Sequence, residues 1–136
     1  MITHLLDTSA LLAHYFGEPG ADEVNNLWQE PGNRIGICVL TLPELKMQLR
    51  VEVKDSKEVD RVFDIYTKEL TIPVIVNRKV ALTATGLRES VKARLPLIDA
   101  VIAACAKSEN AILVHRDHHM ATIPQNLVDQ IYLPDE

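Results

Sequence analysis

The most informative stretch of the chain is Ile2–Leu12, ITHLLDTSALL. Its first residues predict a short apolar strand, and this strand ends abruptly at an acid, Asp7. Thr8 and Ser9 follow, and an apolar run then begins a helix. Asp and Ser are common at such junctions because their side-chain oxygens accept hydrogen bonds from the N–H groups of the first helical turn. The stretch therefore predicts a strand, an acid at its carboxyl end and a helix.

The rest of the chain repeats this alternation of short apolar runs and segments with helical periodicity. Further strands are expected at Ile35–Leu40, Ile72–Val76, Ala111–Val114 and, weakly, Gln130–Leu133. Helices are expected at Ser9–Phe16, Ala21–Glu30, Thr41–Lys54 and Ser56–Leu70, from Asn77 to about Ala93, and at Leu97–Ser108. Strands that alternate with helices predict an α/β fold with a parallel sheet. Pro73 favours an edge position, or the beginning of a strand, for its segment.

Length and composition point to one folded domain over residues 1–136. Apolar residues make up 47% of the chain and charged residues 24%, which is typical of a soluble globular protein. No apolar run approaches the roughly 20 residues that span a bilayer. The N-terminus lacks the basic, apolar and small-residue segments of a signal peptide. We therefore expect a cytoplasmic protein with no membrane contact.

The charge and the cysteines exclude some classes of function. A formal charge of −5 argues against nonspecific nucleic-acid binding through a broad basic patch, although acids at a metal site would lower the total charge of a nuclease. The six aromatic residues are too few for a wide base-stacking platform. Cys38 and Cys105 lie in apolar segments without metal-ligand spacing, so we expect buried, reduced thiols.

Four acids stand where an apolar element begins or ends: Asp7, Glu44, Asp99 and Asp117. Asp7 and Asp117 follow expected strands, whereas Glu44 and Asp99 lie in the first turns of expected helices. In a parallel sheet with helical crossovers these positions share one edge, at the carboxyl ends of the strands. Each acid also has a plain structural role available. Asp7 could cap a helix, and Glu44 could pair with Thr41 in a capping box. Asp99 could be stabilised by the helix dipole, and Asp117 could be a turn residue.

Taken together, the four acids indicate a metal site. Asp99 is the only charged residue between Pro96 and Lys107, in a helix that is apolar on nearly every side. A buried carboxylate is unfavourable, and neighbouring carboxylates make it more so unless a cation neutralises them. Oxygen ligands without cysteine select Mg²⁺ or Mn²⁺. Such sites hydrolyse phosphodiester bonds by activating water and stabilising charge on the phosphate.

Four motifs carry a family resemblance: LLDTSALL, TLPELK around Glu44, LPLIDAVIAACA around Asp99, and ILVHRDHHM around Asp117. The chain resembles a PIN-domain ribonuclease over essentially its whole length, most closely the toxin of a VapBC-type toxin–antitoxin pair. The resemblance implies a three-layer fold whose mostly parallel sheet has the strand order 3-2-1-4-5. It also implies endonucleolytic cleavage of RNA with Mg²⁺ or Mn²⁺, a cognate antitoxin partner and a homodimer.

The resemblance also assigns roles to residues. Asp7 and Asp99 would be the principal metal ligands, and Glu44 and Asp117 would complete the pocket directly or through water. Either Glu44 or Asp99 would orient the attacking water. The remaining roles fall to two hydroxyls that would support these acids, those of Ser9 and Thr41.

The fourth motif departs from the family pattern at Met120, where an aromatic is frequent, and at His115, where Thr or Ser is frequent. It holds three histidines, His115, His118 and His119. These raise the alternative of a zinc site, but their spacing matches no zinc-enzyme pattern, so we expect solvated loop histidines. Arg116 is a candidate for binding RNA phosphates.

Other functions remain open from the sequence. Asp7 could accept phosphate covalently, although position 9 is Ser where the DxD motif of dehalogenase-like phosphatases would need a second acid. A Ser9 nucleophile lacks the GxSxG context. The amphipathic pair of helices over Thr41–Leu70 could instead dock a partner, which would make the domain an interaction module. An RNA-processing nuclease without an antitoxin is a further alternative.

Overall fold

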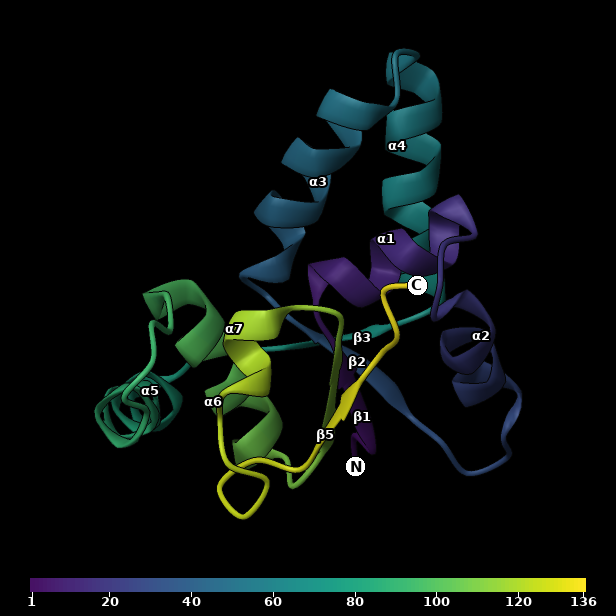
Figure 1. Ribbon diagram of the computed structural model, residues 1–136. Coiled ribbons are helices and arrows are strands. Elements are labelled where there is room, and N and C mark those ends of the chain that lie inside the picture. The colour runs from purple at the N-terminus through teal and green to yellow at the C-terminus, as the bar shows by residue number, and fades with distance from the viewer.

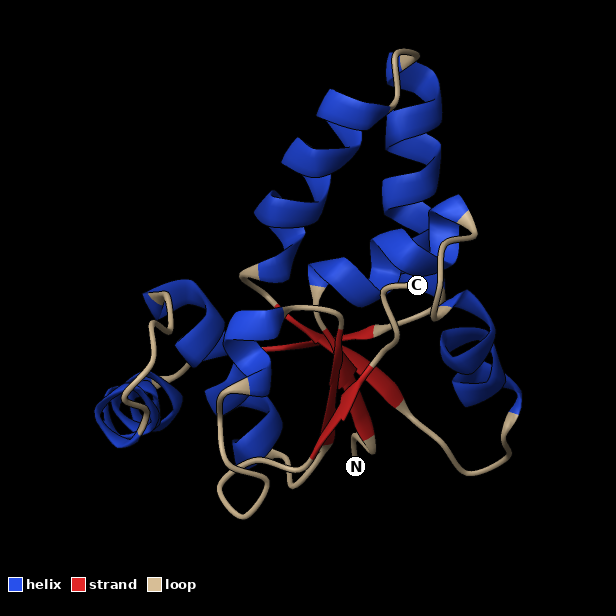
Figure 2. Ribbon diagram, viewed as in Figure 1, coloured by secondary structure: helices blue, strands red, loops and turns tan.

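The computed structural model describes residues 1–136 and has a five-stranded sheet at its centre (Figures 1 and 2). The strands are β1 (His4–Leu6), β2 (Ile35–Cys38), β3 (Ile72–Val74), β4 (Ile112–His115) and β5 (Gln130–Tyr132). Their order is β3-β2-β1-β4-β5, and every neighbouring pair is parallel. The expected order is confirmed, and the sheet is parallel throughout. Pro73 lies on the edge strand β3, as expected.

Helices cover both faces of the sheet and make three layers (Figure 2). One face packs against α1 (Thr8–Phe16), α2 (Ala21–Gln29), α3 (Thr41–Glu52) and α4 (Ser56–Asp64). The other face packs against α5 (Arg78–Ser90), α6 (Leu97–Ser108) and α7 (His118–Ala121). Helices α3 and α4 form a pair that projects beyond the carboxyl ends of the strands (Figure 1). None of the helices combines the length and the apolar character that crossing a bilayer requires.

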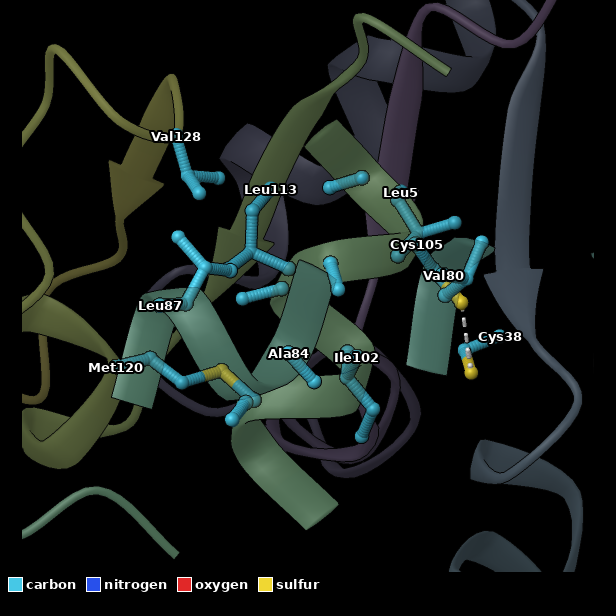
Figure 3. Close-up of a cluster of buried hydrophobic side chains, with 14 of the residues drawn as sticks. Leu5, Cys38, Val80, Ala84, Leu87, Ile102, Cys105, Leu113, Met120 and Val128 are labelled. Atoms are coloured by element: carbon cyan, nitrogen blue, oxygen red, sulfur yellow. Dashed lines mark hydrogen bonds between the residues drawn. The ribbon is translucent and has the colours of Figure 1, made fainter. Parts of the chain in front are cut away.

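Alternation along the strands divides the core into two parts. Leu5 of β1 packs towards α5 and α6, whereas the next residue, Leu6, packs towards α1 and α3, and both are fully buried. Helix α6 buries a run of small and apolar residues, Ile102–Ala106, between the sheet and α5, which confirms its expected deep position. Figure 3 shows the first part of the core, where strand side chains meet those of α5, α6 and α7.

The two cysteines meet inside this first part of the core. Cys38 at the end of β2 and Cys105 on α6 are fully buried and free, with their sulfur atoms 3.1 Å apart (Figure 3). The hydrogen bond from the Cys105 thiol lowers the pKa of Cys38 and raises that of Cys105. The expected buried, reduced thiols are confirmed.

Two helix predictions are wrong at their carboxyl ends. The helix expected over Ser56–Leu70 ends at Asp64, and a π-helical turn, η1 (Ile65–Glu69), follows. The wider turn keeps Tyr66 buried, where its hydroxyl lies 2.6 Å from Nδ1 of His14. Helix α5 ends at Ser90 rather than near Ala93, and the Ser90 hydroxyl donates to a backbone carbonyl one turn earlier.

Candidate functional site

The structure brings the four predicted acids to the carboxyl edge of the sheet. Asp7 joins β1 to α1, and Asp117 joins β4 to α7. Glu44 and Asp99 lie in the first turns of α3 and α6. The charges of Asp117 and Glu44 both raise the pKa of Asp7 and of Asp99, so the carboxylates are close enough to interact. We refer to these four residues as the acidic pocket.

Asp7 is the most deeply buried of the four, with 4% of its surface exposed. Its Oδ1 accepts hydrogen bonds from the Ser9 hydroxyl at 2.7 Å and from the N–H of Ala10 at 3.1 Å, which confirms its expected capping role. These bonds favour the carboxylate, but burial outweighs them. Burial, together with the nearby acids, raises the pKa of Asp7 from 3.8 to about 7. A helix cap alone does not require such burial.

Ser9 links two segments of the site that are far apart in the sequence. Its hydroxyl donates to Asp7 and accepts from the backbone N–H of Arg116 at 2.8 Å. The segment after β4 is therefore tied to the first turn of α1, directly beside Asp117. Ser9 holds the relative position of two acids that are 110 residues apart in sequence.

Asp99 and Asp117 form the other half of the acidic pocket, and both are half-buried. Burial contributes most to the rise in the pKa of Asp99, to about 6; the charges of Asp117 and Glu44 and a hydrogen bond with Asp117 add to it. Asp117 caps α7 by accepting from the N–H of His119 at 2.8 Å. The charges of Asp117 and Glu44 thus disfavour a negative charge on Asp99 in the absence of a cation.

Glu44 is positioned by a residue that the sequence did not reveal. Its Oε1 accepts a short hydrogen bond from the Thr8 hydroxyl, which joins α1 to α3. The expected capping box between Thr41 and Glu44 is wrong, because Leu40 is the N-cap of α3 and makes no side-chain cap bond. The Thr41 hydroxyl is fully buried and has no hydrogen-bond partner. The one available signal for Thr8 was its place next to Asp7.

His115 differs from its predicted place in a solvated loop. It is the last residue of β4 and is fully buried. Its Nε2 lies 2.7 Å from Oε1 of Gln130, and its Nδ1 accepts from the N–H of Asp117 at 3.1 Å. Burial lowers the pKa of His115 and favours the neutral ring that this acceptor role requires. His115 thus orients the backbone that carries Asp117.

Arg116 points towards the loop between α1 and α2. Its guanidinium donates to Oε1 of Glu18 at 2.9 Å and to the carbonyl of Pro19 at 3.0 Å, and 20% of its side chain is exposed. The Arg116 guanidinium is therefore held by an ion pair that is partly open to solvent, and together with Ser9 and Glu18 it lines a cavity that contains none of the four acids.

The chemistry of the acidic pocket fits a hard divalent cation. All its donors are oxygens, and two carboxyls with raised pKa values would be stabilised in their ionised form by positive charge. An ion in such a pocket can bind some carboxylates directly and others through water, as Mg²⁺ commonly does. The unpartnered Thr41 hydroxyl at the start of α3 is a further available oxygen.

This combination of parallel sheet and acidic edge agrees with the family comparison. The family model of the PIN domain matches residues 4–126. The chain belongs to the PIN-domain family.

Solved structures of toxin–antitoxin proteins share the fold. VapBC2 from Rickettsia felis, bound to a promoter DNA fragment, has a TM-score of 0.78 and 20% identity, over 98% of this chain and 100% of that one. VapBC-1 from nontypeable Haemophilus influenzae has a TM-score of 0.75 and 20% identity, over 97% of this chain and 98% of that one. Mycobacterium tuberculosis VapC20, a toxin that cleaves the sarcin–ricin loop, has a TM-score of 0.69 and 14% identity, over 88% of this chain and 93% of that one. No curated protein sequence matches the chain.

Proposed function

We propose that this protein is an endoribonuclease that hydrolyses RNA phosphodiester bonds with Mg²⁺ or Mn²⁺, and that it is the toxin of a toxin–antitoxin pair. The observation that carries the proposal is the pair of carboxyls, Asp7 and Asp99, whose pKa values are raised in a shared acidic pocket. Membership of the PIN-domain family and likeness to VapC structures, one of an RNA-cleaving toxin, support it.

Each residue of the acidic pocket has a distinct proposed role. Asp7 and Asp99 hold the ion, and Glu44 and Asp117 complete the pocket directly or through water. The bound ion supplies positive charge that activates water and neutralises the phosphate in the transition state. Glu44 or Asp99 orients the attacking water by accepting a hydrogen bond from it. Two hydroxyls keep these acids in place, since Ser9 holds Asp7 and Thr8 holds Glu44, whereas the proposed supporting hydroxyl of Thr41, at the start of α3, makes no hydrogen bond in the metal-free protein.

We also propose that Arg116 binds an RNA phosphate. An ion pair that is partly open to solvent, such as that with Glu18, contributes about 0–1 kcal/mol. A phosphate can therefore replace Glu18 as the partner of the guanidinium at little cost. Arg116 would then hold the RNA backbone near the acidic pocket.

The proposed partners are a cognate antitoxin and a second copy of the chain, in the cytoplasm. The VapBC structures that share this fold are toxin–antitoxin complexes. The α3–α4 pair carries exposed apolar side chains that such a partner would cover; Met47 and Val51, one turn apart on α3, are 66% and 70% exposed. Unpartnered apolar surface of this kind is common at interfaces.

RNA cleavage by the protein purified free of antitoxin tests the proposed activity. We expect cleavage with Mg²⁺ or Mn²⁺ that stops on chelation. Asp7→Asn should be inactive yet folded by circular dichroism, and Asp22→Asn, which changes an exposed acid on α2, should cleave at the wild-type rate. Cleavage that persists in Asp7→Asn would mean a contaminant or the wrong site. An inactive wild-type protein would favour an interaction module built on α3 and α4. Cleavage by a protein for which no cognate antitoxin exists would favour an RNA-processing nuclease.

A further inference from the structure

We propose that Asp117, His118 and His119 form a second cation site, which binds a transition-metal ion of the Zn²⁺ class beside the acidic pocket. The inference deepens the proposed function and rests on it in one respect, namely that Asp117 belongs to both sites. Its ligand set differs from that of the acidic pocket because it contains nitrogen.

The geometry of the three side chains supports this site. One ligand atom from each residue lies within 4.8 Å of the other two. The two imidazole rings are 4.1 Å apart between centroids and tilted by 39°. Ligand atoms around a tetrahedral Zn²⁺ are about 3.4 Å apart, given Zn–N bonds of about 2.0–2.1 Å. Binding would therefore require the ligand atoms to move closer together, and the His118 side chain is exposed.

The Asp117 carboxylate is already oriented for such a role. One oxygen, Oδ1, accepts from the N–H of His119 at 2.8 Å, which fixes the carboxylate at the start of α7. The Asp117 side chain also shares a hydrogen bond with Asp99, which an ion bound at Asp117 would replace. Such an ion would have the two imidazoles that follow in the chain as its other ligands. Three protein ligands leave one position for water or for a phosphate oxygen of the substrate.

Two imidazoles change the metal preference of this site. Mg²⁺ favours oxygen ligands, whereas imidazole favours Zn²⁺ and its neighbours in the transition series. The acidic pocket and the histidine site should therefore discriminate between cations. Because both use Asp117, Zn²⁺ bound by the histidines removes negative charge from the acidic pocket. We expect micromolar Zn²⁺ to weaken the stabilisation of the protein by Mg²⁺.

Cobalt absorption spectroscopy tests the site without relying on RNA cleavage. Tag-free protein, stripped of metal, is titrated with Co²⁺, whose visible absorption intensifies when nitrogen ligands replace water in a low-coordinate site. We expect one equivalent to give this intense absorption and Zn²⁺ to abolish it. His118→Gln should lower the Co²⁺ affinity roughly tenfold, and the double variant His118→Gln/His119→Gln should lose the absorption. His4→Gln, which removes an imidazole on β1, is the matched control and should leave the spectrum unchanged.

Two further variants separate this site from the acidic pocket. Asp7→Asn should keep the Co²⁺ absorption, whereas the double histidine variant should keep its thermal stabilisation by Mg²⁺, which also shows that it is folded. Equal Co²⁺ binding by the wild type and the double variant, or loss of binding in His4→Gln, would overturn the proposal. If no form of the protein cleaves RNA, the proposed nuclease function fails while the Co²⁺ spectra still decide this site.

Discussion

Asp7 combines an observed structural role with a proposed functional one. Its Oδ1 caps α1, and its position between β1 and α1 places the carboxyl inside the edge of the sheet. A cap needs only an oxygen, which Asn provides equally well. Only the negative charge of Asp7 distinguishes a metal ligand from a cap, and the substitution Asp7→Asn separates the two roles.

We expect Asp7→Asn to stabilise the protein in the absence of metal. The folded state holds the Asp7 proton up to about pH 7, whereas the unfolded state releases it near pH 3.8. Unfolding therefore releases a proton between these values, and the stability of the wild type falls as the pH rises from about 4 to 7. The increase in the free energy of unfolding caused by Asp7→Asn should be absent below pH 4 and reach at most about 4 kcal/mol above pH 7. Urea unfolding with chelator present measures it.

The same measurement on Asp22→Asn provides the control. Asp22 is exposed, so its replacement should leave the pH profile parallel to that of the wild type. If Asp7→Asn instead destabilises the metal-free protein at pH 8, its carboxylate has a stabilising partner at that pH, and the electrostatic account of the acidic pocket is wrong.

Replacing Arg116 tests its proposed contact with RNA. In the inactive Asp7→Asn background, Arg116→Ala should weaken RNA binding severalfold and reduce the dependence of the affinity on salt by about one counterion. Arg94→Ala, which removes an exposed arginine in the loop before α6, is the control for net charge. Fluorescence anisotropy with a labelled RNA at several salt concentrations measures both quantities, and an unchanged affinity in Arg116→Ala would remove this role.

Two threonines at helix starts offer a matched pair of substitutions. Both side chains are buried, but the Thr8 hydroxyl joins α1 to α3 through Glu44, whereas the Thr41 hydroxyl has no partner. Thr8→Val should cost about 1 kcal/mol of unfolding free energy, because it removes a hydrogen bond to a carboxylate and retains the shape of the side chain. Thr41→Val should be neutral or stabilising in the metal-free protein, because it removes an unsatisfied buried hydroxyl.

Chemical denaturation of both variants, with and without Mn²⁺, completes this comparison. Thr8→Val should also weaken Mn²⁺ binding, since Glu44 loses the donor that positions it. Equal losses of stability in Thr8→Val and Thr41→Val would show that the cross-helix hydrogen bond contributes nothing specific.

Most elements followed from the sequence because their signals are local. Periodicity placed the β-strands and every α-helix except α7, where loop histidines were expected, and Pro73 correctly indicated an edge. The failures involve contacts between elements. Nothing local to Thr41 and Glu44 indicates that Thr8 of another helix takes the Glu44 carboxylate, so the capping-box pattern misled. His115 looked like a loop residue because its partner, Gln130, lies on β5, the weakest predicted strand. The sequence already places His118 and His119 beside Asp117, but only the structure shows that one ligand atom of each lies within 4.8 Å of the others.

The whole protein should report on the acidic pocket through its thermal stability. Millimolar Mn²⁺ should raise the melting temperature, because the ion binds four acids that only the folded state brings together. A concentration of one hundred times Kd contributes about 2.7 kcal/mol, or roughly 8–13 °C at about 3–5 °C per kcal/mol for a chain of this size. Asp99→Asn should remove most of this gain in differential scanning fluorimetry. No metal-dependent shift in the wild type would count heavily against the acidic pocket.

The strand order sets the time at which this protein becomes competent during its own synthesis. The middle strand, β1, has as neighbours β2 and β4, and its register with β4 joins His4 to Ile112. A nascent chain on the ribosome therefore lacks one side of its central strand, and with it Asp117, until β4 has emerged. A product that stops between α6 and β4 contains three of the acids but not the partner strand that would align them. The topology thus leaves the acidic pocket incomplete in every such product.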